Sequence, residues 1–167
     1  MADRKGGLLN YTTVIEPMKT AQDIIGLLVV HGASRIQLIT DKGAISGIAF
    51  GIRVGDTELA YRLPINIKAI EDVLRAHRKK GRISISEYKI TEQAPRTAWR
   101  ILKAWVEVQM ALVETGMAEP AEVFLPYLLT TGGDMTLYEV MREKWVALPE
   151  PKENEQEAGG TLEDGAE

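Results

Sequence analysis

The sequence predicts a single α+β domain. A four-stranded, mainly antiparallel sheet (β-α-β-β-β along the chain) is expected to be followed by three to four helices. Three observations predict this class. Residues 35–63 hold three short alternating segments separated by tight turns, which is the pattern of a β-meander. Apolar residues recur at steps of three and four across residues 92–115, as in an amphipathic helix. Residues 147–167 are rich in Pro, Gly and Glu, a composition that predicts a disordered acidic tail.

The sheet is expected to begin before the first helix. Leu8–Ile15 has the composition of a strand, and Pro17 would end it. Thr20 then opens a helix that Gly32 closes, because glycine readily adopts the left-handed conformation found after a helix C-terminus. The three remaining strands and the two turns between them are Arg35–Thr40, Asp41-Lys42-Gly43, Ile45–Val54, Gly55-Asp56 and Thr57–Leu63.

The second half of the chain is expected to be mostly helical. Asn66 caps a helix that ends before Gly81, and Arg82–Ile90 alternates like an edge strand or an extended loop. The longest helix is expected from Glu92 to Thr115, with Pro95 in its first turn, where a missing N–H is tolerated. Its predicted core stripe is Ala94, Ala98, Ile101, Trp105, Val108 and Leu112.

Two shorter helices are predicted from start signals near the end of the domain. Glu119-Pro120 places a proline in a first helical turn. Thr136 with Glu139 forms a capping box for a last helix through Trp145. The domain is therefore expected to occupy residues 1–146 and the tail residues 147–167.

The composition excludes several kinds of site. The chain has 167 residues and no cysteine, which rules out disulfides, thiolate zinc sites, iron–sulfur clusters and a cysteine nucleophile. Metal-ligand, phosphate-loop and hydrolase motifs are also missing. We therefore expect no catalytic residue, metal or cofactor, and a non-enzymatic role is favoured over a small enzyme. Without a signal peptide or a membrane-spanning segment, the expected location is the cytoplasm.

Charge is strongly segregated along the chain. The net charge of −4 combines +1 for residues 1–67, +6 for residues 68–103, −5 for residues 104–146 and −6 for the tail. The tail is interpreted as a solubilising segment, with a nucleic-acid mimic that competes for a basic patch as the alternative. The basic block of residues 68–103 is the segment where a polyanion is expected to bind.

The candidate site lies in this basic block. Arg96, Arg100 and Lys103 share one stripe near the start of the longest helix, where the helix dipole disfavours cations but would favour a bound phosphate. The alternative interpretation is that these side chains pair with acids elsewhere, such as those of residues 104–146. The remaining candidates are the cations Lys79, Lys80 and Arg82, with Tyr88 and Trp99 as rings that could stack on bases.

One long signature resembles a family of small proteins associated with phages and prophages. It consists of AWRILKAWVEVQMALVETGM, then EVFLPY and TLYE, with YTT at Tyr11, HGA at His31 and QA at Gln93 as further elements. The likeness spans most of residues 10–140, and Pro95 and the acidic tail are features of this member. The family carries no assigned activity. The resemblance implies phage biology, either DNA metabolism or interference with host defence.

These observations lead to two functional hypotheses. The first is a phage-type accessory protein that binds nucleic acid or phosphate groups through the basic block, without catalysis. The alternative is an inhibitor of a host defence system that binds a host protein or sequesters a small ligand. Either protein would act in the host cytoplasm if a phage encodes it, and no membrane partner is expected. The sequence also permits a homo-oligomer, formed through an exposed edge at Ile45–Val54.

Overall fold

The computed structural model describes residues 7–144. The elements follow in the order α1 (Pro17–Val30), β1 (Ala33–Asp41), β2 (Ala44–Val54), β3 (Thr57–Arg62), α2 (Ile67–Lys79), α3 (Glu87–Glu114), α4 (Pro120–Phe124), a 3₁₀ turn (Leu125–Tyr127) and α5 (Leu137–Glu143). The α+β class is confirmed, with three strands in the described residues. The predicted tail lies outside the described residues, as does Trp145.

The sheet is an antiparallel meander with β2 at its centre. Lys42 and Gly43 both have positive φ in the first turn (47° and 81°), a conformation that matches the twist of a two-stranded hairpin. The central position of β2 corrects the expectation of an exposed edge at Ile45–Val54. Ala49–Val54 of this strand pairs with β3, and Ala44–Ile52 pairs with β1. The outer edges of the sheet are therefore those of β1 and β3.

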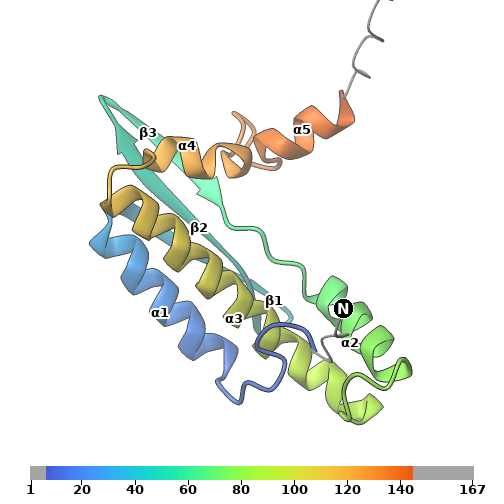
Figure 1. Ribbon diagram of the computed structural model, residues 1–167. Helices are drawn as coiled ribbons and strands as arrows, with labels where there is room; N and C mark the ends of the chain where they lie inside the picture. Colours follow the sequence, from blue (N-terminus) through green and yellow to red (C-terminus); the bar gives the residue numbers. More distant parts are fainter. Residues whose placement is uncertain (1–6, 145–167) are drawn as a thin grey trace, which may run out of the picture.

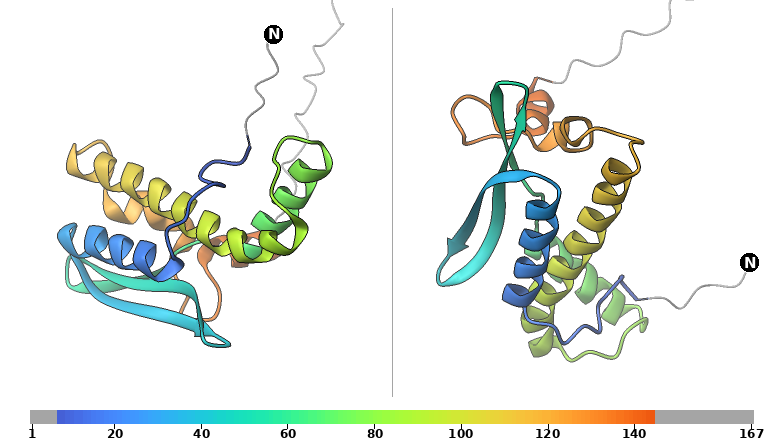
Figure 2. Two further views of the ribbon diagram at one scale, coloured as in Figure 1. Left: turned by 90° about the horizontal axis from the view of Figure 1, so that it is seen from below. Right: turned by 90° about the vertical axis from the view of Figure 1, so that its left-hand side faces the viewer.

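Helices α1 and α3 lie side by side on one face of the sheet, while α2 packs against the first half of α3 (Figures 1 and 2). The main core lies between these helices and the sheet, where Phe50 of β2 stacks on Tyr61 of β3 with ring centroids 5.4 Å apart. A second, smaller core of Leu74, Ile83, Ile90 and Ala94 joins α2 to α3. The fold therefore has two apolar clusters, one under each end of α3.

The predicted strand at Leu8–Ile15 is wrong. The segment forms two successive turns, in which Tyr11 N donates to Leu8 O and Thr13 N donates to Asn10 O, both at 3.1 Å. Asn10 has a φ of 61°, which is incompatible with an extended strand. Leu8 and Tyr11 instead pack on the smaller core, so apolar residues that suggested a strand serve as an anchor for the N-terminal segment.

Two helices begin earlier than predicted. Helix α1 starts at Pro17, since proline is well suited to the first helical position. Helix α3 starts at Glu87 rather than Glu92, so Pro95 lies inside it. Of the two alternatives for Arg82–Ile90, the edge strand does not form, whereas residues 83–86 are a loop. The side chain of Ile90 is fully buried. Burial of Ile90 in the smaller core favours an earlier start of α3. The alternating pattern of residues 82–90 did not indicate this start.

The buried face of α3 is rotated from the predicted stripe. Ala94 and Ala98 are buried as expected, but Val108 is exposed and Trp105 is only partly buried. The buried residues of this helix are Ile90, Ala94, Thr97, Ala98, Trp99, Leu102, Val106 and Met110. The wider face arises because α1, α2 and the sheet contact α3 from different sides.

Thr97 provides a stability prediction. Its side chain is fully buried, and its hydroxyl has no hydrogen-bond partner in the described chain. Replacing Thr97 by valine keeps the side-chain volume and removes the unpaired hydroxyl, so we expect the free energy of unfolding to rise by about 1 kcal/mol. Urea unfolding of the variant and the wild type measures this difference. A loss of stability would mean that the hydroxyl has a partner.

Candidate nucleic-acid interface

Arg96, Arg100 and Lys103 are engaged in ion pairs. Arg96 donates from Nη2 and Nε to Glu16 at 2.5 and 3.0 Å, and from Nη1 to Glu92 at 2.9 Å. Arg100 lies 4.0 Å from Asp23 of α1, and Lys103 pairs with Glu107 one turn further along α3. The side chains of these three cations are only 21%, 25% and 15% exposed.

These pairs match the alternative interpretation of the stripe, in which its cations meet acids of the same chain. Glu107 lies in residues 104–146, as that interpretation suggested. Glu16 and Asp23 come instead from the N-terminal part of the chain. The hydrogen bond to Glu16 is the main reason that the pKa of Arg96 is raised. With all three guanidinium nitrogens bonded to carboxylates, Arg96 has little capacity left for a phosphate.

Trp99 is unavailable for stacking on a base. Its side chain is fully buried in the main core, and this corrects the prediction that its ring is a candidate contact. Tyr88, the other ring predicted to stack on bases, is 77% exposed. Eleven residues separate the two rings, so at about 100° per residue they differ by only about 20° around the helix axis. They differ in position along α3, because Tyr88 lies in its first turn and Trp99 lies near its middle.

A second group of cations remains exposed where α2 ends and α3 begins. We call it the α2–α3 corner and define it as Lys79, Lys80, Arg82, Tyr88 and Lys89. All five side chains are exposed, and in the described part of the chain none of the four cations lies within 4.0 Å of a carboxylate. Lys89 Nζ lies 5.9 Å from the centre of the Tyr88 ring. The structure thus divides the predicted site into a paired half and an unpaired half.

The backbone brings these residues together. Gly81 has a φ of 67°, and this left-handed conformation ends α2 and reverses the chain. Gly81 N then donates to Arg78 O and Arg82 N donates to His77 O, both at 2.9 Å. The last carbonyls of α2 are satisfied in this way, and the chain returns toward α3 after only a few residues.

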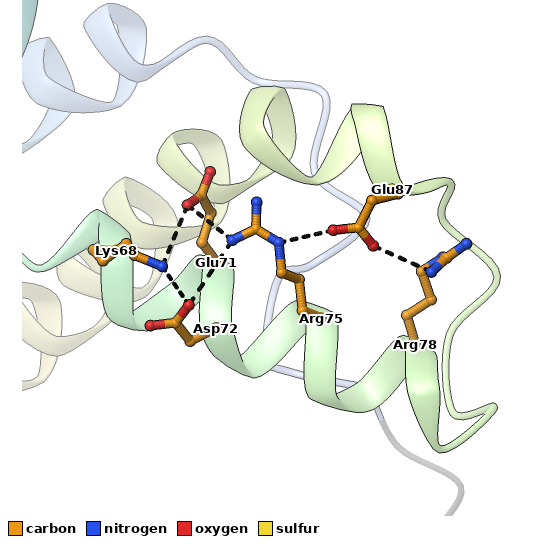
Figure 3. Close-up of polar contacts among 6 residues, drawn as sticks. All are labelled: Lys68, Glu71, Asp72, Arg75, Arg78 and Glu87. Atoms are coloured by element: carbon orange, nitrogen blue, oxygen red, sulfur yellow. Dashed lines mark hydrogen bonds and ion pairs between the residues drawn. The ribbon is translucent and has the colours of Figure 1, made fainter.

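An ion-pair network fixes the start of α3 against α2 (Figure 3). Glu87 accepts from Arg75 at 2.8 Å and from Arg78 at 3.1 Å, and the first of these bonds is the main reason that the pKa of Arg75 is raised. Arg75 also contacts Glu71 and Asp72, which pair with Lys68. Since Glu87 is committed to two arginines, it does not neutralise Lys79, Lys80, Arg82 or Lys89.

Sequence reasoning missed one cation of the corner and a separate groove. Lys89 could have been predicted as a candidate contact, because it follows Tyr88 directly within the basic block. The groove, about 890 Å³ in volume, lies between the sheet and α5 and is lined by Arg62, Tyr127 and Arg142 among others. Arg62 reaches Glu139 at 2.7 Å across more than seventy residues of sequence, a contact that no local pattern could indicate.

Glu139, the acid that pairs with Arg62, also takes part in the cap of α5. Glu139 accepts a hydrogen bond from Thr136 N at 2.6 Å, while Thr136 Oγ1 accepts from Glu139 N at 3.3 Å. The predicted capping box is therefore confirmed. The backbone bond from Thr136 is the main cause of the lowered pKa of Glu139. This carboxylate is already occupied by its cap and by Arg62, so it is poorly placed to act as a catalytic base.

Comparison with known proteins gives no match to a family model, to a curated protein or to a solved structure. None of the helices in residues 7–144 is long and apolar enough to cross a membrane. Within the same residues, no group of three or more His, Asp or Glu side chains is arranged to hold a metal ion. The charge and geometry of the corner are therefore the features that indicate what the protein binds.

Proposed function

We propose that the protein binds nucleic acid without catalysis, through phosphate contacts at the α2–α3 corner. The observation that carries the proposal is a set of four exposed cations with no carboxylate partner in the described residues. Residues 78–89 contain five basic side chains and one acidic side chain, a local net charge of +4. Cations in this arrangement release counterions from a polyanion when they bind it.

The exposed ring of Tyr88 favours single strands over duplexes. It lies next to Lys89 at the edge of the cation cluster, where an unpaired base could stack on it while the lysine contacts the adjacent phosphate. Contacts to phosphates carry no sequence information, so binding at the corner is expected to depend on charge and to be nearly independent of sequence. An accessory protein of a phage is the setting that the sequence resemblance implies.

Salt titration tests this function. Fluorescence anisotropy with labelled single- and double-stranded DNA and RNA gives the affinity at 50 and 200 mM salt. Four phosphate contacts predict a loss of about 100-fold in duplex affinity between these two concentrations. The variant K79A/K80A/R82A/K89A should lose most of the affinity and most of the salt dependence. Tyr88→Ala should weaken single-strand binding more than duplex binding.

Two controls separate the corner from net charge. K19A/K42A/R53A/R142A removes the same number of positive charges at other exposed positions, and it should retain most of the affinity. R96A/R100A/K103A removes the cations that are paired within the chain and should also retain it. Equal losses in the corner variant and the first control would contradict a local site, and absence of binding at 50 mM salt would contradict the function.

The groove beside α5 favours a second candidate function, the sequestration of a small ligand by an inhibitor of host defence. Its volume of about 890 Å³ suits a ligand of nucleotide size, and Arg142 at its rim has no carboxylate within 4.0 Å in the described chain. Native mass spectrometry of the purified protein would detect a retained ligand. The corner remains the better candidate, because Arg62 inside the groove is already neutralised by Glu139.

A further inference from the structure

The outer edge of β1 has no backbone partner in residues 7–144. The opposite edge of the sheet is partly covered, because the chain returns along β3 and Leu129 N donates to Ala60 O at 2.8 Å. Nothing comparable runs along β1, whose nine residues pair on one side only, with β2. Free N–H and C=O groups in a row form a template for another strand.

The direction of these groups follows from the contacts with β2. Ser46 Oγ donates to Ile39 O at 3.2 Å across the β1–β2 pair, so the carbonyl of Ile39 turns toward β2. Backbone groups alternate along an antiparallel strand, and those of Ile36, Leu38 and Thr40 therefore turn outward. The strand contains neither proline nor lysine, two residues that commonly protect an exposed edge.

The charges of β1 are complementary to a second copy of the same strand. In an antiparallel pair with its two-fold axis at Leu38, the outward-turned residues face one another, with Leu38 opposite Leu38 and Ile36 opposite Thr40. The same register places Arg35 opposite Asp41 of the second copy, and this pair occurs twice. Both side chains are exposed. Arg35 lies 3.6 Å from Glu58 within its own chain, so its guanidinium would join two carboxylates.

Helix α1 presents an apolar stripe on the same side of the molecule. Its inner face is buried in the main core through Ala21, Ile24 and Leu28, and Asp23 and the preceding Glu16 form ion pairs with α3. Around the helix axis, Met18, Ile25 and Val29 lie within about 40° of one another and roughly opposite Asp23, and the exposed fractions of Met18 and Val29 are 47% and 56%. Figure 2 shows α1 above the β1 side of the sheet, with α3 beyond it. This stripe would meet its own copy if two β1 edges paired.

We propose that the protein forms a two-fold symmetric dimer in which two β1 edges join into one six-stranded sheet, flanked by contact between the two α1 stripes. Three observations support a second copy of this chain as the partner. They are the unpaired backbone of β1, the pairing of Arg35 with Asp41 in the register about Leu38, and the apolar stripe of α1. The α2–α3 corner lies at the other side of α3 (Figure 1), so dimerisation and nucleic-acid binding are independent.

Light scattering coupled to size-exclusion chromatography tests the dimer. The full chain at about 100 µM should show twice its mass of 18.5 kDa. Val29→Lys and Asp41→Lys should each weaken dimerisation by about tenfold or more, since each places a charge where the partner offers an apolar or a basic surface. Adding Arg35→Glu to Asp41→Lys restores the opposite charges and should recover most of the loss.

The chain offers a matched control one residue away. Val30 is 81% exposed on a different face of α1, so Val30→Lys should leave the dimer intact. Leu38→Cys should form a disulfide between two copies, because this residue pairs with itself in the proposed register and the wild-type chain has no cysteine. A monomeric wild type would overturn the proposal, as would a dimer that resists Val29→Lys and Asp41→Lys, or equal effects of Val29→Lys and Val30→Lys.

Discussion

Replacing Trp99 by alanine should lower the free energy of unfolding by about 3–5 kcal/mol. The side chain is the largest of those that are fully buried, and it lies in the main core with Leu102 and Val106 of the same helix. Its removal leaves a cavity between the helices and the sheet that the neighbours can fill only in part. A loss of this size is a large share of the total stability of an ordinary domain. Urea unfolding followed by circular dichroism measures it.

Two further variants test the reason for this loss. The indole N–H of Trp99 has no hydrogen-bond partner in the described chain, so Trp99→Phe removes an unpaired donor as well as volume and should cost less than the alanine variant. Trp105 is only partly buried at the edge of the same core, and Trp105→Ala should also cost less than Trp99→Ala. If Trp105→Ala proved the more damaging, the orientation of α3 would have to be revised.

Features that depend on a few neighbouring residues could be predicted from the sequence. Asn66 Oδ1 accepts from Ala69 N at 3.0 Å as the predicted cap of α2, and the capping box of α5 and both hairpin turns also form as expected. In each case the side chain or the backbone conformation that makes the structure lies within three or four residues of its partner. Local sequence therefore contains the information that these elements require.

Features set by tertiary packing could not be predicted in the same way. Two predictions were wrong: the strand at Leu8–Ile15 and the start of the longest helix at Glu92. Both concern segments that pack on the smaller core. Alternation in residues 82–90 indicated an edge strand or an extended loop. The chain has a loop at 83–86 and a helix from Glu87, and Ile83 and Ile90 are buried in the smaller core. The rotation of α3 that buries Trp99 likewise depends on three elements that contact the helix at once.

The candidate site shows the same division. The basic block was visible in the sequence, but its separation into paired and unpaired cations was not. Arg96 bonds to Glu16 across eighty residues of sequence, and only the side-by-side, parallel packing of α1 and α3 brings them together. Within residues 7–144, Lys79, Lys80, Arg82 and Lys89 have no carboxylate partner, because Glu87, the acid of the same segment, is held by Arg75 and Arg78.

Replacing Leu74 by alanine should lower the free energy of unfolding by about 2–5 kcal/mol and should also disturb the α2–α3 corner. Leu74 is fully buried in the smaller core, where it packs with Ile83 and Ile90. These two residues are direct neighbours of Arg82 and Lys89, so the cluster beneath the corner sets the spacing of its cations. Hydrogen exchange should increase in residues 67–90, while β2 and the second half of α3 keep their protection.

Val73→Ala is a control that distinguishes the loss of core packing at Leu74 from a general loss of helix stability in α2. It is partly exposed on the same helix, and Val73→Ala should change stability by less than half as much as Leu74→Ala. Under conditions where all variants remain folded, Leu74→Ala should reduce nucleic-acid affinity, whereas Trp99→Ala should leave it nearly unchanged, because Trp99 supports the other core. Equal losses of affinity in these two variants would contradict this argument, since binding would then follow overall stability and not the geometry of the corner.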